Sequence, residues 1–97
     1  MLLSQLPGND LMFLAKVFVR LKPTVNDPEG QIIQSGLQQL GFKSVSSVRA
    51  GKYIEICIGE NTRTKATQMV EEMCQKLLAN PVIEDYHFDL EELEGES

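Results

Sequence analysis

The segment Lys16 to Lys22 alternates strictly along the chain, and this alternation constrains the fold more than any other feature. It places Val17, Val19 and Leu21 on one face and Lys16, Phe18, Arg20 and Lys22 on the other. A period of two residues is typical of a β-strand with one buried face. The fold must therefore contain a sheet, together with a second layer that covers its apolar side.

The segment Asp27-Pro28-Glu29-Gly30 predicts the start of a helix. Its aspartate suits the N-cap, its proline suits the first helical position, and its glutamate suits the helix dipole. Apolar residues then recur at helical spacing, at Ile33, Leu37 and Leu40. Gly36 leaves room for close packing, and Gly41 is well placed as the left-handed residue after a helix of about three turns.

Two strand-like runs follow, Val45 to Arg49 and Tyr53 to Ile58. Ala50-Gly51 joins them, and Gly51 can adopt the positive φ that a tight turn demands. These features predict a β-hairpin.

A second helix is predicted from its cap and its apolar stripe. Thr62 or Thr64 can cap it, and Asn80 and Pro81 end it. The stripe consists of Met69, Val70, Met73, Cys74, Leu77 and Leu78. The run Tyr86 to Leu90 then alternates as a last half-buried strand.

The order of elements is thus βαββαβ. It predicts an α+β two-layer sandwich, with an antiparallel sheet and two helices on one face, related to ferredoxin-like folds. The open sheet face would carry Phe18, Arg20, Tyr53, Glu55 and Cys57. Such a mixed face suits either a homodimer or a plain solvated sheet.

Length and charge limit the function classes. A chain of 97 residues makes one domain with a modest core. Half of its 14 acidic residues follow Val82, and no Lys or Arg follows Lys76, which argues against nucleic acid as a partner. Residues 1–14 resemble neither a signal peptide nor a membrane span. The two cysteines, Cys57 and Cys74, lie in apolar surroundings and indicate buried thiols of a cytoplasmic protein.

Catalytic, cofactor-binding and metal-binding constellations are not found in the sequence. The single histidine, His87, falls beside Asp85 and Asp89 on one strand face and is expected to pair with carboxylates in water. One histidine and two separated cysteines do not make a zinc site, and the glycine-rich phosphate loops are lacking. Arg49 and Lys52 either dock an anionic ligand or partner, or are simply exposed basic residues at strand ends.

Three stretches resemble the PurS family, the small subunit of phosphoribosylformylglycinamidine synthase, over about residues 15 to 92. They are the first strand with its Asp-Pro-x-Gly helix start, the segment Val48-Arg49-Ala50-Gly51-Lys52-Tyr53-Ile54-Glu55, and the segment from Met73 through Leu78-Ala79-Asn80-Pro81 to Tyr86. The resemblance divides the chain into an N-terminal extension (1–14), a single PurS-like domain (15–90) and an acidic tail (91–97).

The resemblance implies a subunit without catalysis of its own, which as a homodimer or higher oligomer bridges a glutaminase subunit and a synthetase subunit and helps ammonia pass between them. ATP, magnesium and glutamine would be used by the complex, with no cofactor on this chain and no nucleic acid or membrane as partner. The interface candidates are Arg49, Gly51, Lys52, Tyr53, Asn80 and Tyr86.

Two alternatives remain at this point. One is a stand-alone dimeric metabolite-binding module of ferredoxin-like type. The other is a small acyl-phosphate hydrolase, which would need a phosphate-cradling loop near the first strand; Arg20 lies within the strand and no such loop is evident.

Overall fold

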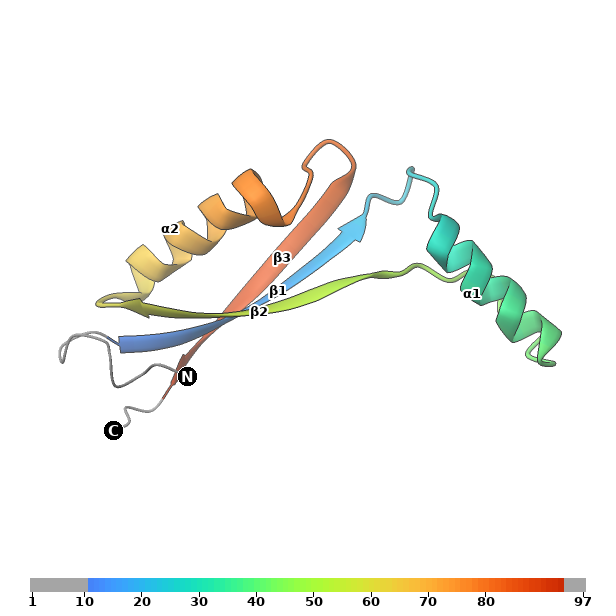
Figure 1. Cartoon of the computed structure of the whole chain (residues 1–97), viewed down its shortest axis with the longest axis horizontal. Coiled ribbons are helices and arrows are strands. Elements are labelled where there is room, and N and C mark those ends of the chain that lie inside the picture. The colour runs from blue at the N-terminus through green and yellow to red at the C-terminus, as the bar shows by residue number, and fades with distance from the viewer. Residues whose placement is uncertain (1–10, 94–97) are drawn as a thin grey trace.

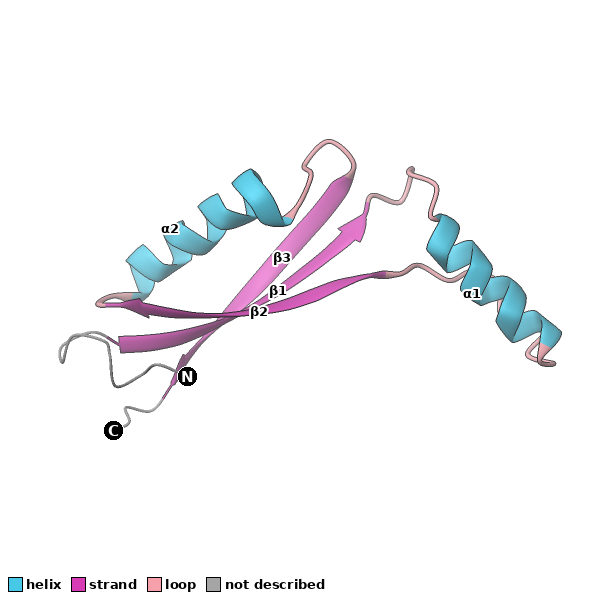
Figure 2. Cartoon of the chain, in the orientation of Figure 1, coloured by secondary structure: helices cyan, strands magenta, loops and turns pink. Residues whose placement is uncertain are grey.

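The computed structural model describes residues 11–93 (Figure 2). Its elements in chain order are β1 (Leu11–Leu21), α1 (Pro28–Gln39), β2 (Gly51–Glu60), α2 (Arg63–Met73), the π-helical turn η2 (Cys74–Leu78) and β3 (Glu84–Leu93). The predicted α+β class, with an antiparallel sheet and two helices, is confirmed.

The described strands form one antiparallel sheet in the order β2-β1-β3. Val17 lies opposite Ile54 on one side and Phe88 on the other, whereas the next residue, Phe18, lies opposite Tyr53 and His87. The alternation of β1 therefore divides the sheet as the sequence predicts, into an apolar face and an open, mixed face.

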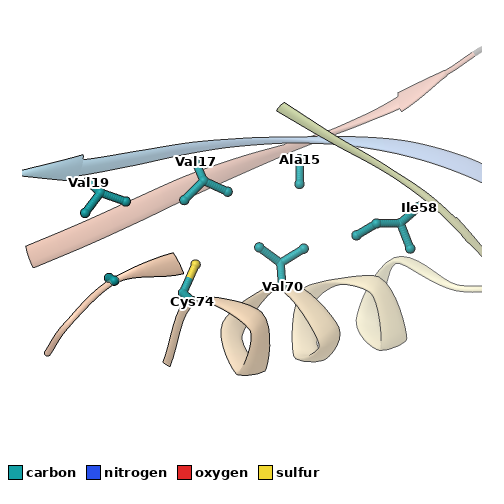
Figure 3. Packing of buried hydrophobic residues seen from close by; sticks show 7 residues of the cluster. Ala15, Val17, Val19, Ile58, Val70 and Cys74 are labelled. Carbon is teal, nitrogen blue, oxygen red and sulfur yellow. The ribbon is translucent and has the colours of Figure 1, made fainter. Parts of the chain in front are cut away.

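The core lies between the apolar sheet face and α2. Thr62 caps this helix, since its Oγ1 accepts a hydrogen bond of 3.1 Å from the backbone N–H of Lys65. Figure 3 shows Val70 and Cys74 of the helical layer pointing toward Ala15, Val17, Val19 and Ile58 of the strands. All six are buried.

The second helical segment ends in a wider turn than predicted. The backbone N–H of Ala79 donates to the carbonyl of Cys74 at 3.0 Å, a bond across five residues that marks η2 as π-helical. Asn80 then organises the turn into β3, because its carbonyl accepts hydrogen bonds from Ile83 and Glu84, and its side-chain oxygen accepts one from Val82. The helix exit near Asn80 has a structural role of its own.

Helix α1 does not cover the sheet, so the prediction of two helices on one face is wrong for this chain by itself. Figure 1 shows α1 beyond the ends of the strands, while α2 lies along the sheet. The chain measures 55 × 28 × 17 Å, and its radius of gyration is 18.0 Å, against about 12.5 Å for a compact domain of this length. A Cβ added at Gly36 would meet nothing within 4 Å, so the close packing expected there is not made within the chain.

The predicted hairpin is also absent from the described residues. Residues 45–50 follow α1 in the predicted place, but they form no ladder, and the sheet has three strands. Gly51 opens β2 without a positive φ; among the described residues only Gly41 has one, at 105°, as predicted. A Cβ at Gly51 would lie 2.6 Å from the carbonyl oxygen of Val19, so close approach of two strands is what requires this glycine.

The structure also differs from the sequence-based expectations in the exposure of one cysteine and in where the first strand begins and the last strand ends. Cys57 is exposed on the open face, because it falls on the polar side of the alternation, whereas Cys74 is buried as expected. β1 begins at Leu11 and β3 extends to Leu93, so both the predicted extension and the predicted tail contribute residues to the sheet. The remainder of those segments, residues 1–10 and 94–97, lies outside the described residues.

Candidate functional site

A compact junction, here called the neck, joins α1 to the sheet. It consists of residues 22–30 on the way into the helix and residues 48–50 on the way out. Asp27 holds the two sides together, since its carboxylate accepts the backbone N–H of Gly30 at 3.0 Å and that of Ala50 at 2.7 Å. These two bonds hold the pKa of Asp27 below its ordinary value, with a smaller contribution from the Arg49 guanidinium.

Arg49 closes the neck from the other side. Its Nη2 donates to the carbonyl oxygens of Lys22 at 2.9 Å and Val25 at 2.8 Å. Because a charged guanidinium here satisfies two main-chain acceptors of the turn after β1, the geometry assigns Arg49 a structural role.

Gly30 lets the two sides of the neck touch. A Cβ at this position would lie 2.2 Å from the carbonyl oxygen of Val48, which no side chain tolerates. The Asp-Pro-x-Gly motif therefore combines a helix cap with a site of close backbone contact. Together, the three neck contacts set the direction in which α1 leaves the sheet.

The arm, defined as residues 28–48, exposes an apolar stripe. Ile32 is 73% exposed and Leu40 75% exposed, and Ile33 and Phe42 are also exposed. The opposite side of α1 is occupied, because Gln34 and Gln38 donate to the carbonyl oxygens of Ser46 and Val45 in the returning segment. The stripe thus faces away from everything described in this chain.

A second apolar surface, here called the groove, lies beside α2. It is an open cavity of about 510 Å³ lined by Ile56, Met69, Glu72, Met73, Lys76, Leu77 and Leu78. Leu77 is 83% exposed. The two charged residues at the rim neutralise each other, since Lys76 Nζ lies 2.7 Å from the Glu72 carboxylate.

The open sheet face carries an aromatic cluster at its centre. Phe18 stacks on His87 with ring centroids 4.7 Å apart, and its other neighbour, Tyr53, lies at 4.9 Å. The hydroxyl of Tyr53 donates to Glu55 at 2.8 Å, and this bond, together with partial burial, raises the pKa of the phenol. An open hollow of about 640 Å³ begins beside these rings and extends toward the neck.

The hollow brings together five of the six predicted interface residues. Its lining includes Arg49, Gly51, Lys52, Tyr53 and Tyr86, but not Asn80. The hydroxyl of Tyr86 lies on the helical side of the sheet, where it donates to Glu71 and accepts from Gln75. The hydrogen bond to Glu71 raises the pKa of Tyr86. Whether these six residues contact partners stays a prediction.

Comparison with known proteins identifies the family. Residues 14–92 match the model of PurS, phosphoribosylformylglycinamidine (FGAM) synthase. The chain belongs to the PurS family.

Relatives in this family match the chain over most of its length. The PurS subunit of phosphoribosylformylglycinamidine synthase from Synechocystis is 46% identical over 89 residues, which cover 92% of this chain and 89% of the relative. The corresponding Bacillus subtilis subunit is 45% identical, over 84% of this chain and 96% of the relative.

Solved PurS structures share the architecture. The Methanocaldococcus jannaschii PurS structure has a TM-score of 0.75 and 48% identity, over 84% of this chain and 99% of that one. A chain in the structure of PurLQS from Thermotoga maritima has a TM-score of 0.73 and 32% identity, over 84% of this chain and 98% of that one.

The surfaces of this PurS family member are suited to contact between proteins. Within residues 11–93, no group of three or more His, Cys, Asp or Glu side chains is placed to hold a metal ion. None of the helices in this part of the chain is long and apolar enough to cross a membrane. The cluster, the stripe and the groove offer apolar area, and the bonded charges around them offer specificity.

The stripe and the exposed edge of the groove were not predicted as surfaces. The sequence pattern assigned Ile33, Leu37 and Leu40 to the core, because helical spacing identifies an apolar side without identifying what covers it. One signal was available: Ile32 widens the apolar side of a helix that carries few charges.

Proposed function

We propose that this chain is the small subunit of phosphoribosylformylglycinamidine synthase and works through contacts with other chains. The observation that carries the proposal is the arm, which lies within the stretch that matches the family and carries an exposed apolar stripe. The family match and the names of its relatives supply the identity of the complex. In this reading the chain bridges a glutaminase subunit and a synthetase subunit in purine biosynthesis.

The bridging role extends to ammonia transfer. Ammonia released from glutamine is largely protonated in water near neutral pH, and a protonated amine is no nucleophile, so its path must be shielded from solvent. A non-catalytic subunit supports this step by holding the two active sites in fixed relation. ATP, magnesium and glutamine are then used by the larger subunits, in the cytoplasm, and this chain holds no cofactor.

We further propose that the working form is a homodimer or a higher homo-oligomer. A stable interface of standard size buries about 800 Å² on each partner. The stripe and the groove are exposed apolar surfaces at different places on the same chain. Exposed apolar surfaces of this kind are typical of sites that another protein surface buries. A paired chain also presents each remaining surface twice, which suits a bridge between larger subunits.

The test is reconstitution with the glutaminase and synthetase of the same cell. Amidine formation is measured with glutamine and, separately, with ammonium chloride as nitrogen source. We expect omission of this chain to abolish most glutamine-dependent turnover and to reduce ammonia-dependent turnover much less. Equal glutamine-dependent turnover with and without the chain would contradict the proposal.

A second function is favoured by one observation, the hollow beside the aromatic cluster. It is large enough for a small metabolite, and Arg20 and Lys52 supply positive charge there, while Arg49 is already bonded to carbonyl oxygens. A stand-alone dimeric metabolite-binding module would bind such a ligand without partners. Equilibrium dialysis of the isolated chain against anionic metabolites distinguishes the two functions.

A further inference from the structure

We infer that the hollow beside the aromatic cluster binds a phosphate monoester with a small hydroxylated body, such as a sugar phosphate. The inference specifies the ligand of the second function proposed above and rests on the hollow named there. It does not require the chain to work without partners, because the stripe and the groove lie elsewhere on the chain and stay available for contacts.

The hollow arises where one row of the open sheet face lacks a side chain. Gly51, Arg20 and Asp85 lie opposite one another across the three strands, in the row next to the aromatic rings. Gly51 fills none of the space beside Arg20. A Cβ at Gly51 would lie 2.6 Å from the carbonyl oxygen of Val19, so a larger residue there would displace β1. The gap is therefore a fixed feature of the sheet.

The lining of the hollow is cationic, although the whole chain carries a formal charge of −5. Its cations are Arg20, Arg49 and Lys52. The one carboxylate of the lining, that of Asp85, is already bound by Lys22 Nζ at 3.1 Å. Among residues 11–93, neither Arg20 nor Lys52 forms an ion pair. An anion in the hollow therefore meets cations that no described carboxylate neutralises.

Arg49 contributes donors that are held in place before a ligand arrives. Its Nη2 donates to the carbonyl oxygens of Lys22 and Val25, and these bonds fix the guanidinium beside the hollow. Nη1 and Nε carry further N–H groups. A planar guanidinium binds phosphate through paired N–H donors, whereas the ammonium of Lys52 adds a compact charge. Arginine together with lysine is thus a donor set that suits a phosphate group.

The aromatic cluster favours an anion over a stacked base. Phe18 packs between Tyr53 and His87, with ring centroids 4.9 Å and 4.7 Å away, so both faces of its ring are occupied. Phe18 therefore turns a ring edge toward the row that contains the hollow, and ring edges carry positive partial charge. An anionic group gains from this edge, whereas a nucleobase would need a free ring face.

The acids of β3 limit the ligand to a small molecule. Asp89 lies four residues beyond Asp85 on the same strand face, or about 14 Å away. This separation exceeds the Debye length of about 8 Å at physiological ionic strength, so the charge of Asp89 reaches the hollow only weakly. A nucleic-acid strand would run over these acids, whereas a sugar phosphate stays clear of them.

The rest of the lining suits a hydroxylated body. His87 and Asp85 bring nitrogen and oxygen atoms that can exchange hydrogen bonds with hydroxyl groups. The volume of about 640 Å³ is in the usual range for a small-molecule site. The phosphate then lies among the cations and the body lies along β3.

Titration of the full-length chain, followed by NMR, tests the site. We expect glucose 6-phosphate to shift the amide signals of Gly51 and Lys52 and to saturate, and glucose to leave them unchanged. Arg20→Gln and Lys52→Gln each remove one free cation at an exposed position, and each should weaken binding of glucose 6-phosphate at least tenfold. The matched control Lys65→Gln removes the same charge from an exposed position of α2 and should bind as the unaltered chain does.

Three results would overturn the site. One is unchanged binding in both Arg20→Gln and Lys52→Gln, with circular dichroism showing that the variants are folded. Another is binding of inorganic sulfate as tight as that of glucose 6-phosphate, which would indicate general attraction of anions. The third is a set of shifted signals that lies away from the hollow.

The outcomes separate this inference from the proposed subunit role. If glucose 6-phosphate shifts no signals while the chain supports glutamine-dependent turnover, the site is wrong and the subunit assignment stands. If glucose 6-phosphate binds at Gly51 and Lys52 while the chain is dispensable for that turnover, the site is supported and the subunit assignment fails.

Discussion

The carboxylate of Asp27 accepts the backbone N–H of Ala50 at 2.7 Å, and so joins two points of the chain that are 23 residues apart. This bond makes the entry and the exit of the arm a single unit. Replacing Asp27 with Asn removes the charge, and replacing it with Ala removes both acceptors. We expect faster hydrogen exchange at the amides of Gly30 and Ala50 in both variants, more so in Asp27→Ala, because these donors lose their charged partner.

The control for this change is Glu29→Gln, which also removes one carboxylate from the start of α1 but leaves the neck bonds in place. Its amide exchange at Gly30 and Ala50 should match that of the unaltered chain. Unchanged exchange in Asp27→Ala would show that the neck is held by other contacts.

Acid should weaken the neck in a defined direction. The folded-state pKa of Asp27 lies below its ordinary value because the carboxylate accepts two backbone N–H groups. A group with a depressed folded pKa stabilises the fold above its unfolded pKa, about 3.9, and this contribution is lost as the pH falls through the folded pKa. Urea unfolding measured downward from pH 7 should show a loss of stability below about pH 4 that is smaller in Asp27→Asn. Parallel pH profiles of the two proteins would contradict the assignment.

Alanine substitutions at Gly30 and Gly36 should have opposite effects on stability, because only Gly30 lies in close contact with another part of the backbone. Gly30→Ala must displace the carbonyl of Val48 and should destabilise the chain, whereas Gly36→Ala meets nothing within 4 Å. In the absence of self-association, Gly36→Ala should raise the stability of α1 by up to about 1 kcal/mol, since alanine is the better helix former. Helical circular dichroism during thermal unfolding measures both. An equal effect of the two substitutions would contradict the close contact at the neck.

The two cysteines should differ sharply in reactivity. Cys57 is exposed on the open face, whereas Cys74 is fully buried, and burial together with the nearby Glu71 raises the pKa of its thiol. The thiolate is the reactive form, so a thiol reagent should modify Cys57 rapidly and Cys74 only as the chain unfolds. Cys57→Ser should abolish the rapid phase. A rapid phase that persists in this variant would place Cys74 at the surface.

Truncating Phe13 tests whether the sheet begins before the PurS-like domain assigned from the sequence. Its side chain is fully buried, and the guanidinium of Arg63 lies 5.7 Å from its ring centroid. Phe13→Ala should lower the free energy of unfolding by about 3–5 kcal/mol. Leu11→Ala, at an exposed position of the same strand, is the control and should cost far less. A small loss in Phe13→Ala would support the sequence-based boundary after residue 14.

Local signals in the sequence predicted much of this fold. The alternation around Val17 predicts which strand residues lie on each face of the sheet, Asp27 is the expected cap of α1, and Thr62 is one of the two caps considered for α2. Gly41 has the positive φ assigned to it. Each of these features depends on residues near one another in the chain, so periodicity and capping rules suffice.

The misjudged features depend on contacts between distant segments. Gly51 is required by the carbonyl of Val19, 32 positions earlier, rather than by a turn, so the hairpin around it was wrong. The apolar side of α1 was identified correctly, but helical spacing alone does not show whether the same chain covers it. Of the candidate site, Arg49 was found as part of a motif, while its bonds to Lys22 and Val25 require the folded neck to be seen.

The positive φ of Gly41 has a mechanical consequence. It reverses the chain at the tip, so that the arm leaves and re-enters the sheet at one point, through β1 and β2, which are hydrogen-bonded neighbours. A force applied to the tip is therefore shared by two adjacent strands pulled in the same direction, and it loads the ladder between them very little. The arm is thus anchored to the sheet through two neighbouring strands, one on each side of the neck.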